Sequence, residues 1–420
     1  MKRRTVLKGI AGGTVSLAAA PTLLASTYGT AYAAEDEIKV GVLFPLSGTI
    51  AVIGRSLHNA TMLAIDEINA NGGISGKKIK PIVRDSQSSP AVYADKIKEL
   101  ILQQKVLTTF GGYTSASRKA VLPVVEKYNS LYWYPTLYEG DECSKNIMYT
   151  GAVPNQQQEQ FVPWLIKNFG KRFYLLGSNY IYPKDENRIC KALLKKYGGE
   201  VVAEEYVPLG HSEFSSNINK MRSLRPDVIF CTVVGDSVIA LHRQYKTAGL
   251  DPSKMPFASL TTSEEEVSAM GGEYAAGHFT SAPYFMSADT PTNHKFVAAY
   301  QKKYGADKVT NFVSSASYFQ VFLFQKGVEK LLSQGHGVGD LTPINIRNAC
   351  LGEQVHAPQG VVKLDPKNQH TYLWPKIGQW QKDGQAKVIH ESKKWVEPKP
   401  YWMYPGNRVC TPSGVKTEKS

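Results

Sequence analysis

Short apolar segments alternate with helical patterns along most of this chain, and this alternation constrains its fold more than any other feature. An apolar run at 38–48 precedes a helical pattern at 58–73, which ends in Gly72-Gly73 as helices often do. A second predicted strand at 77–87 and a second amphipathic pattern at 90–105 repeat the order. Such strand-helix alternation predicts an α/β fold with a parallel sheet covered by helices on both faces.

The alternation breaks near 150–160 and then starts again. Residues 171–207 have the pattern of strand, helix and strand, and the series continues to about residue 262. Beyond about residue 286, helical patterns are followed at 359–380 by the alternation and turns of antiparallel strands. A chain of 420 residues is also too long for a single ordinary core. We therefore predict two α/β units of similar build.

Residues 1–33 have the composition of an export signal. A basic head with the pair Arg3-Arg4 precedes a weakly apolar stretch, and Ala31-Tyr32-Ala33 provides small residues at a cleavage spacing. The paired arginines resemble a twin-arginine signal. A membrane anchor is the alternative, which the Gly, Ser and Thr content of the stretch disfavours. We expect export to the periplasm, where the formal net charge of +13 would not imply a nucleic-acid partner.

The cysteines show no metal-binding spacing. In an oxidising compartment one or two disulfides are possible, for example between Cys350 and Cys410. Isolated buried thiols are the alternative, particularly for Cys231 within an apolar strand. The pattern leaves the pairing open. The five cysteines are Cys143, Cys190, Cys231, Cys350 and Cys410.

Hydroxyl and aromatic side chains gather where the predicted strands end, which is where open α/β sheets bind ligands. Hydroxyls can pair with both the carbonyl and the NH₂ of an uncharged amide or urea, and tyrosine rings exclude water around a small ligand. Asp236 and Glu264 are the obvious acids at these ends, so an amino acid would find few charged anchors. The predicted ligand-binding residues here are Tyr113, Ser115, Tyr134, Thr136, Tyr180 and Tyr182.

Each of these residues has a structural alternative. Ser115 can cap the helix that follows it, and Tyr134 can be a core ring. Of Tyr180 and Tyr182, one is expected to face the ligand and the other to pack. Thr136 follows a proline and can be a turn residue. Ser263 and Glu264 look first like a helix N-cap with an acidic first turn.

The sequence offers little for catalysis. It has no zinc-binding histidine pair, no nucleophile elbow and no phosphate-binding loop. Cys143 could be imagined as a nucleophile of the nitrilase kind, but no placed glutamate and lysine accompany it. We predict neither catalytic residues nor a metal or cofactor.

Several motifs together resemble the urea and short-chain amide binding proteins of ABC transporters, and the related cytoplasmic amide sensor of aliphatic amidase operons. The helix at 117–127 followed by YPTLYEG at 134–140 carries the resemblance, which spans about residues 38–402. Further matching segments are 146–149, 154–157, 177–183, 259–264, 282–285, 289–291 and 357–360.

The resemblance implies a type I periplasmic binding protein, with two doubly wound parallel-sheet lobes joined by three crossings. It places one lobe at 34–153 and 286–356, the other at 154–285 and 357–403, and a C-terminal tail at 404–420. It supports the same tyrosines, serine and threonine as ligand-binding residues and adds Val234 as an apolar wall. The stretch SLTTSE at 259–264 differs from dedicated urea binders, which tilts selectivity toward small amides. The five cysteines are not a hallmark of the family.

The function that follows is that of a periplasmic solute-binding subunit for urea or short-chain amides. Its partners would be an inner-membrane ABC permease and the ATPase subunits of that permease. Three alternatives stay open: a branched-chain amino-acid binder of the same fold, a ligand-sensing regulator, and a secreted amidase. The export signal disfavours the regulator, and the missing nucleophile set disfavours the amidase.

Overall fold

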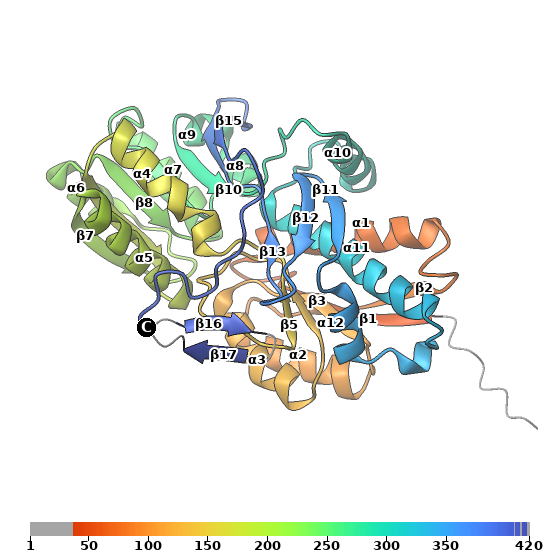
Figure 1. Cartoon of the computed structure of the whole chain (residues 1–420). Coiled ribbons are helices and arrows are strands. Elements are labelled where there is room, and N and C mark those ends of the chain that lie inside the picture. The colour runs from red at the N-terminus through yellow and green to blue at the C-terminus, as the bar shows by residue number, and fades with distance from the viewer. Residues whose placement is uncertain (1–36, 407, 412–413, 418–420) are drawn as a thin grey trace, which may run out of the picture. The chain divides into compact units, whose positions relative to one another are not determined.

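The structure is a computed structural model that describes residues 37–406, 408–411 and 414–417 (Figure 1). The predicted signal peptide at 1–33 lies outside the described residues. Within the described range, none of the helices combines the length and the apolar composition that a membrane crossing requires.

The first sheet has the strand order β2-β1-β3-β4-β5, and its pairings are parallel. Helices connect each strand to the next through β4, as the alternation in the sequence predicts. The inner strand β1 is buried along most of its length because helices cover both faces. The elements are β1 (Glu37–Phe44), α1 (Ala51–Ala70), β2 (Lys78–Asp85), α2 (Pro90–Leu102), β3 (Thr108–Gly111), α3 (Ser115–Lys127), β4 (Tyr132–Tyr134) and β5 (Ile147–Tyr149).

The second sheet has the order β15-β14-β10-β9-β8-β6-β7. The strands from β10 to β7 pair in parallel, whereas β14 and β15 add an antiparallel edge. Its parallel part is formed by β6 (Arg172–Ser178), β7 (Glu200–Val207), β8 (Val228–Thr232), β9 (Phe257–Ser259) and β10 (Phe279–Ala282), and its edge by β14 (Lys376–Trp380) and β15 (Ala386–Glu391). The accompanying helices are the 3-10 helix η1 (Pro154–Gln156), α4 (Gln158–Asn168), α5 (Ile181–Tyr197), α6 (Ser215–Leu224), α7 (Asp236–Thr247), α8 (Glu264–Met270) and α9 (Gly272–Ala275).

After β10 the chain returns to the helices of the first sheet. Tyr304 Oη donates to Asn59 O at 2.8 Å, and Asn311 Nδ2 donates to Ser56 Oγ at 2.9 Å, so this segment packs on α1. A small antiparallel sheet follows, which confirms the prediction for 359–380. The elements are α10 (Pro291–Tyr304), α11 (Phe312–Ser333), the 3-10 helix η2 (Val338–Asp340), α12 (Pro343–Cys350), β11 (Gln354–Ala357), β12 (Gly360–Leu364) and β13 (Thr371–Tyr372).

We call the first sheet with α1, α2, α3 and α11 the first lobe, and the second sheet with α4 to α8 the second lobe. In the described part of the chain, the backbone passes between them after β5, after β10 and after β13. The predicted α/β fold with two parallel-sheet lobes and three crossings is therefore confirmed. The exact lobe boundaries given above remain a prediction.

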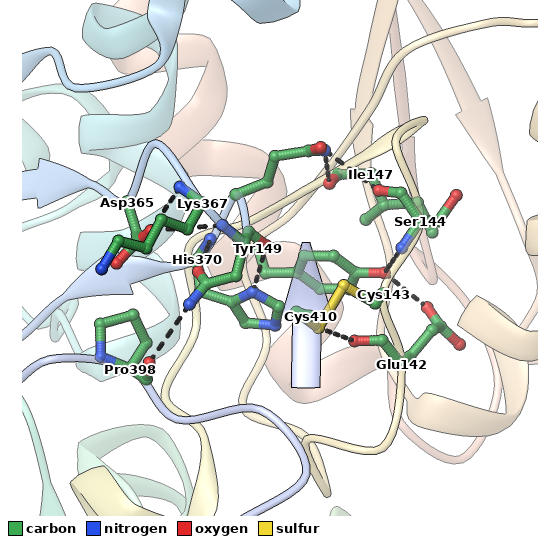
Figure 2. The surroundings of a disulfide bond; sticks show 12 residues. Glu142, Cys143, Ser144, Ile147, Tyr149, Asp365, Lys367, His370, Pro398 and Cys410 are labelled. Carbon is green, nitrogen blue, oxygen red and sulfur yellow. Dashed lines mark hydrogen bonds between the residues drawn. A yellow bond between two sulfur atoms is a disulfide. The ribbon is translucent and has the colours of Figure 1, made fainter. Parts of the chain in front are cut away.

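The C-terminal segment differs from the predicted tail. It forms an antiparallel hairpin of β16 (Arg408–Thr411) and β17 (Gly414–Thr417). Cys410 of this hairpin forms a disulfide with Cys143, with a Cα–Cα distance of 5.7 Å (Figure 2).

The suggested pairing of Cys350 with Cys410 is wrong. Cys350 lies on α12 and is fully buried, with its thiol 3.5 Å from Leu323 O, so it faces α11. The hairpin instead lies beside the segment that carries Cys143, where Tyr401 N donates to Gly140 O at 2.6 Å. The free cysteines, all of them buried, are Cys190, Cys231 and Cys350. The alternative of an isolated buried thiol is therefore confirmed for Cys231.

Candidate functional site

Ends of strands from both lobes meet around one small cavity of about 10 Å³. Six of the seven predicted site residues line it, and Tyr134 does not. Whether the six bind a ligand stays a prediction. The lining residues are Tyr113, Thr114, Ser115, Thr136, Leu137, Tyr180, Tyr182, Val234 and Thr261.

Ser115 begins α3 but does not cap it. Thr114 holds the N-cap position, and the Ser115 hydroxyl donates instead to Glu139 Oε2 at 2.6 Å. The serine oxygen also accepts a hydrogen bond from Arg118 Nη1 at 3.0 Å. The capping interpretation of Ser115 is therefore wrong, and the first backbone amides of α3 have no side-chain cap.

Tyr113 and Thr114 follow β3, whereas Tyr134 ends β4 and Thr136 follows it. The hydroxyl of Thr136 donates to Gly112 O at 2.7 Å. Tyr134 is fully buried, and its ring centroid lies 5.1 Å from the guanidinium carbon of Arg118. Gly112 allows this packing, because its φ is +103° and a Cβ there would be 2.5 Å from the Tyr134 ring. Tyr134 therefore packs as a core ring, but its hydroxyl is buried without a hydrogen-bond partner among the described residues, whereas the core interpretation expected a satisfied hydroxyl.

The second lobe contributes two tyrosines at the start of α5. Tyr180 and Tyr182 both line the cavity, with their ring centroids 6.3 Å apart, so the expected division into one facing and one packing ring does not hold. Tyr182 is only 2% exposed, and its hydroxyl makes no hydrogen bond to any residue that the structure describes.

Val234 and Thr261 complete the second-lobe side. Val234 follows β8, and its backbone amide donates to Ser178 Oγ at 3.2 Å. Thr261 follows β9, and its hydroxyl donates to Val233 O at 2.6 Å. Both positions are therefore fixed by hydrogen bonds at the carboxyl ends of parallel strands, where such sheets bind ligands.

The two acids expected near the ligand do not line the cavity. Asp236 is exposed, and Glu264 is buried with Oε1 accepting from Met286 N at 2.7 Å. Burial raises the pKa of Glu264 to about 8. Ser263 occupies the N-cap of α8, and Glu266 reaches back to accept from its backbone amide at 3.0 Å, which supports the N-cap interpretation.

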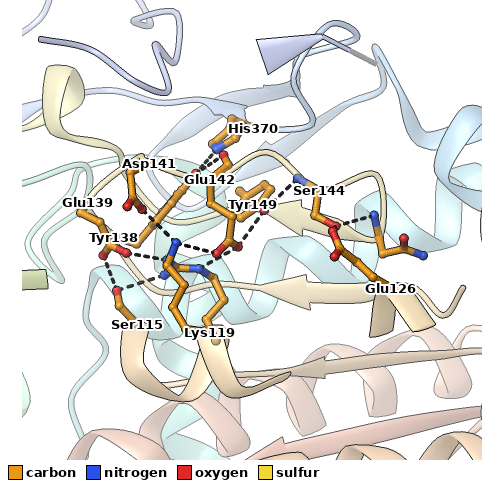
Figure 3. A network of polar contacts seen from close by, with 12 residues as sticks. Ser115, Lys119, Glu126, Tyr138, Glu139, Asp141, Glu142, Ser144, Tyr149 and His370 are labelled. Atoms are coloured by element: carbon orange, nitrogen blue, oxygen red, sulfur yellow. Dashed lines mark hydrogen bonds and ion pairs between the residues drawn. The ribbon is translucent and has the colours of Figure 1, made fainter. Parts of the chain in front are cut away.

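A buried charge network lies behind Ser115 (Figure 3). Arg118 forms ion pairs with Glu139 at 2.6 Å and with Glu142 at 3.0 Å, and the side chains of Arg118 and Glu139 are fully buried. Burial alone would raise the pKa of Glu139, but the adjacent Arg118 and the Ser115 hydroxyl hold it below its ordinary value. Glu139 is therefore ionised.

The network continues toward the surface. Lys119 Nζ lies 3.2 Å from Asp141 Oδ1. Burial, together with the negative charge of Glu139, raises the pKa of Asp141 to about 6. The cluster thus places three carboxyl groups beside the cations of Arg118 and Lys119, so that negative and positive charges largely compensate one another.

Sequence reasoning missed Arg118, Glu139 and Leu137, and it set Thr261 aside among the strand-end residues. A signal for Glu139 was present, because it stands inside the YPTLYEG motif. Buried ion pairs leave no trace in hydropathy patterns, so the partnership with Arg118 could not be read from the sequence. In the described residues, no group of three or more His, Cys, Asp or Glu side chains could hold a metal ion.

Comparison with known proteins gives a consistent result. A family model described as "Periplasmic binding protein domain" matches residues 38–406. A Brucella suis protein named Leu/Ile/Val-binding protein homolog 6 is 25% identical over 343 residues, which cover 80% of this chain and 85% of that protein.

Solved structures share the fold. A solute-binding protein of an ABC transporter from Rhodopseudomonas palustris BisB5, in complex with 3,4-dihydroxybenzoic acid, gives a TM-score of 0.77 at 23% identity, covering 87% of this chain and 99% of that one. A branched-chain amino-acid transporter substrate-binding protein from Streptococcus pneumoniae, in complex with isoleucine, gives a TM-score of 0.72 at 23% identity. The match covers 86% of this chain and 100% of that one.

Proposed function

This chain belongs to the periplasmic binding protein family, and from that premise we propose that it is the solute-binding subunit of an ABC importer for urea or short-chain amides. The ligand binds between the lobes and stabilises their closed arrangement, which the permease and its ATPase subunits then recognise. The predicted signal at 1–33 supports delivery to the periplasm by the twin-arginine route.

One observation carries the choice of ligand: three of the cavity hydroxyls, those of the serine and of two threonines, already donate their hydrogens to protein acceptors. Ser115 donates to a carboxylate, and Thr136 and Thr261 donate to backbone carbonyls. None of these partners can donate a hydrogen in return. The hydroxyls therefore offer lone pairs to the cavity, and a solute with several N–H groups and no charge complements them.

The size of the cavity agrees with this choice. A volume of about 10 Å³ is close to the roughly 10–15 Å³ that one ordered water requires. Pockets for drug-sized ligands measure roughly 300–1,000 Å³. In this closed arrangement, a solute of a few heavy atoms needs only small side-chain shifts, whereas a benzoate ring or a leucine side chain needs the lobes to separate.

The carbonyl oxygen of an amide also needs donors. The uncapped backbone amides at the start of α3 lie beside Thr114 and Ser115, which line the cavity, and a helix N-terminus favours an acceptor. Tyr182 supplies a further hydroxyl without a described partner. These groups would hold the carbonyl while the other hydroxyls accept the N–H groups.

A branched-chain amino-acid binder is the second candidate, because relatives carry the name Leu/Ile/Val-binding protein homolog. The N-terminus of α3 could receive a carboxylate. An ammonium group would then need a free acid at the cavity, but the Glu139 carboxylate is paired with Arg118 and neither Asp236 nor Glu264 lines the cavity. The side-chain chemistry therefore favours the uncharged solute.

Calorimetric titration of the purified protein with urea, formamide, acetamide, leucine and 4-hydroxybenzoate tests the proposal. We expect a measurable dissociation constant for at least one of the first three and none for the two carboxylates. Incubation with acetamide should release no ammonia, which separates a binding protein from an amidase. Tight binding of leucine or of 4-hydroxybenzoate, with none of the amides or urea, would contradict the proposal.

A further inference from the structure

We propose that Glu139 is the residue that sets selectivity for N–H donors, because it takes the hydroxyl hydrogen of Ser115 and leaves Ser115 able only to accept from the ligand. This inference rests on the proposed function and names a selectivity element for it. Glu139 acts through Ser115 and is therefore a positioning residue.

The geometry forms a closed ring of three side chains (Figure 3). Ser115 Oγ donates to Glu139 Oε2 at 2.6 Å, Arg118 Nη2 donates to Glu139 Oε1 at 2.6 Å, and Arg118 Nη1 donates to Ser115 Oγ at 3.0 Å. A guanidinium has donors only, so the hydroxyl hydrogen cannot point toward Arg118. The one remaining direction within the ring is toward the carboxylate.

The ring also fixes how many lone pairs of the Ser115 oxygen remain for a ligand. A serine oxygen has two lone pairs, and the Arg118 hydrogen bond occupies one. Because Ser115 lines the cavity, we assign its second lone pair to a ligand N–H. A ligand that presents an oxygen acceptor there would meet a lone pair instead of a hydrogen.

The surroundings hold the ring in this arrangement. Ser115 is 2% exposed, and the side chains of Arg118 and Glu139 are fully buried, so water does not compete for the hydrogen bonds. Arg118 is held on its other side by Glu142, which also accepts from Tyr149 Oη at 3.0 Å. Breaking such a buried, ion-paired network is costly.

A nearby pair provides a matched control. Glu126 of α3 accepts from Ser144 Oγ at 2.8 Å, which repeats the glutamate–serine hydrogen bond between the same helix and the same following loop. Ser144 does not line the cavity. Glu126 is exposed whereas Glu139 is buried, so replacing Glu126 removes a glutamate–serine bond in a more open setting and leaves the proposed selectivity element untouched.

The test compares acetamide with acetone, which replaces the NH₂ group by a methyl group of similar size. Dissociation constants for both are measured by competition in the wild type, Glu139→Gln, Ser115→Ala, the double variant and Glu126→Gln. The wild type should prefer acetamide by at least about 100-fold, because a site built to pair an N–H rejects the analogue that lacks it. Glu139→Gln and Ser115→Ala should each reduce this preference by about 10-fold or more.

The double variant should lose no more preference than either single variant, because both act through one hydroxyl. Glu126→Gln should keep the wild-type preference. Circular dichroism and thermal unfolding report whether each variant folds; if Glu139→Gln does not, Ser115→Ala alone decides. An unchanged preference in a folded Glu139→Gln or Ser115→Ala protein overturns the inference but not the proposed function. A wild type that binds neither urea nor any amide overturns both.

Discussion

Tyr182 has a different role from the other hydroxyl residues at the cavity. The hydroxyls of Ser115, Thr136 and Thr261 each donate to a protein acceptor, whereas that of Tyr182 is buried without a described partner. A buried polar group without a partner costs about 1–3 kcal/mol, so such groups usually have a reason. Since Tyr182 lines the cavity, we propose that a solute bound there accepts from this hydroxyl.

We predict that Tyr182→Phe weakens binding of the preferred amide by about 5- to 30-fold, which corresponds to roughly 1–2 kcal/mol for a lost hydrogen bond. The free energy of unfolding should not fall, because the hydroxyl makes no described bond within the protein. Calorimetric titration and guanidinium denaturation measure the two quantities.

Tyr245→Phe is a control for which we expect the opposite pair of results. The Tyr245 hydroxyl donates to Met255 O at 2.7 Å, and Tyr245 does not line the cavity. This variant should lose stability, by about 1 kcal/mol, and keep its affinity. Equal affinities for Tyr182→Phe and the wild type would remove Tyr182 from the binding site.

At the scale of elements, the segment between β4 and β5 depends on the C-terminal hairpin. Cys143 of this segment is joined to Cys410 of β16, and Gly140 O accepts from Tyr401 N at 2.6 Å. On the other side, the Tyr149 ring stacks on His370, with centroids 4.2 Å apart (Figure 2). The chain end therefore supports the loop that carries Glu139.

We predict that Cys410→Ser lowers the free energy of unfolding by about 2–4 kcal/mol, because the disulfide restricts the unfolded chain across 267 residues. Guanidinium denaturation of the variant and of the wild type measures the loss. The reducing agent dithiothreitol should destabilise the wild type and leave the variant unchanged.

Alkylation checks the pairing independently. The denatured, unreduced wild type should take up three alkyl groups, on Cys190, Cys231 and Cys350. The Cys410→Ser variant should take up four, because Cys143 becomes free. Labelling of Cys143 in place of Cys350 in the wild type would mean that a different disulfide exists in solution.

The elements that the sequence predicts well are those with a local cause. Apolar periodicity and turn residues mark α1 and β1, and turn residues mark the ends of β3 and β4, so the position of Thr136 at a strand end follows from local pattern. The Cys143–Cys410 bond and the Glu139–Arg118 pair join residues through tertiary packing. Periodicity carries no information about such partners, which is why these features were missed.

At the scale of the whole molecule, the lobes touch beyond the cavity. A Cβ placed on Gly235, which follows Val234 in the second lobe, would lie 3.1 Å from Thr49 O and 3.1 Å from Ile50 Cγ2 of the first lobe. The loop after β1 and the loop after β8 are thus in close contact. We infer that this contact forms when the lobes close around a ligand.

The size of the cavity follows from this closure. Its lining comes from both lobes, so separating the loops at Gly235 would widen it and expose the solute to water. In the proposed mechanism, only closed molecules hold the ligand, so its affinity depends also on residues that never touch it. Sequence patterns could predict two lobes but not how closely they approach.

We predict that Gly235→Ala weakens binding of the preferred amide by about 3- to 10-fold, because its methyl group disfavours the closed arrangement by roughly 1 kcal/mol. Gly235 has φ +66°, so the change also strains the backbone. Gly249→Ala separates the two effects: Gly249 has φ +71°, but no atom lies within 4 Å of the place that an alanine methyl group would take. Gly235→Ala should lose more stability in guanidinium denaturation, because its ψ of −145° combined with a positive φ is a conformation that essentially only glycine adopts. Only Gly235→Ala should lose affinity in calorimetry. Equal affinities in the two variants would show that contact at Gly235 plays no part in closure.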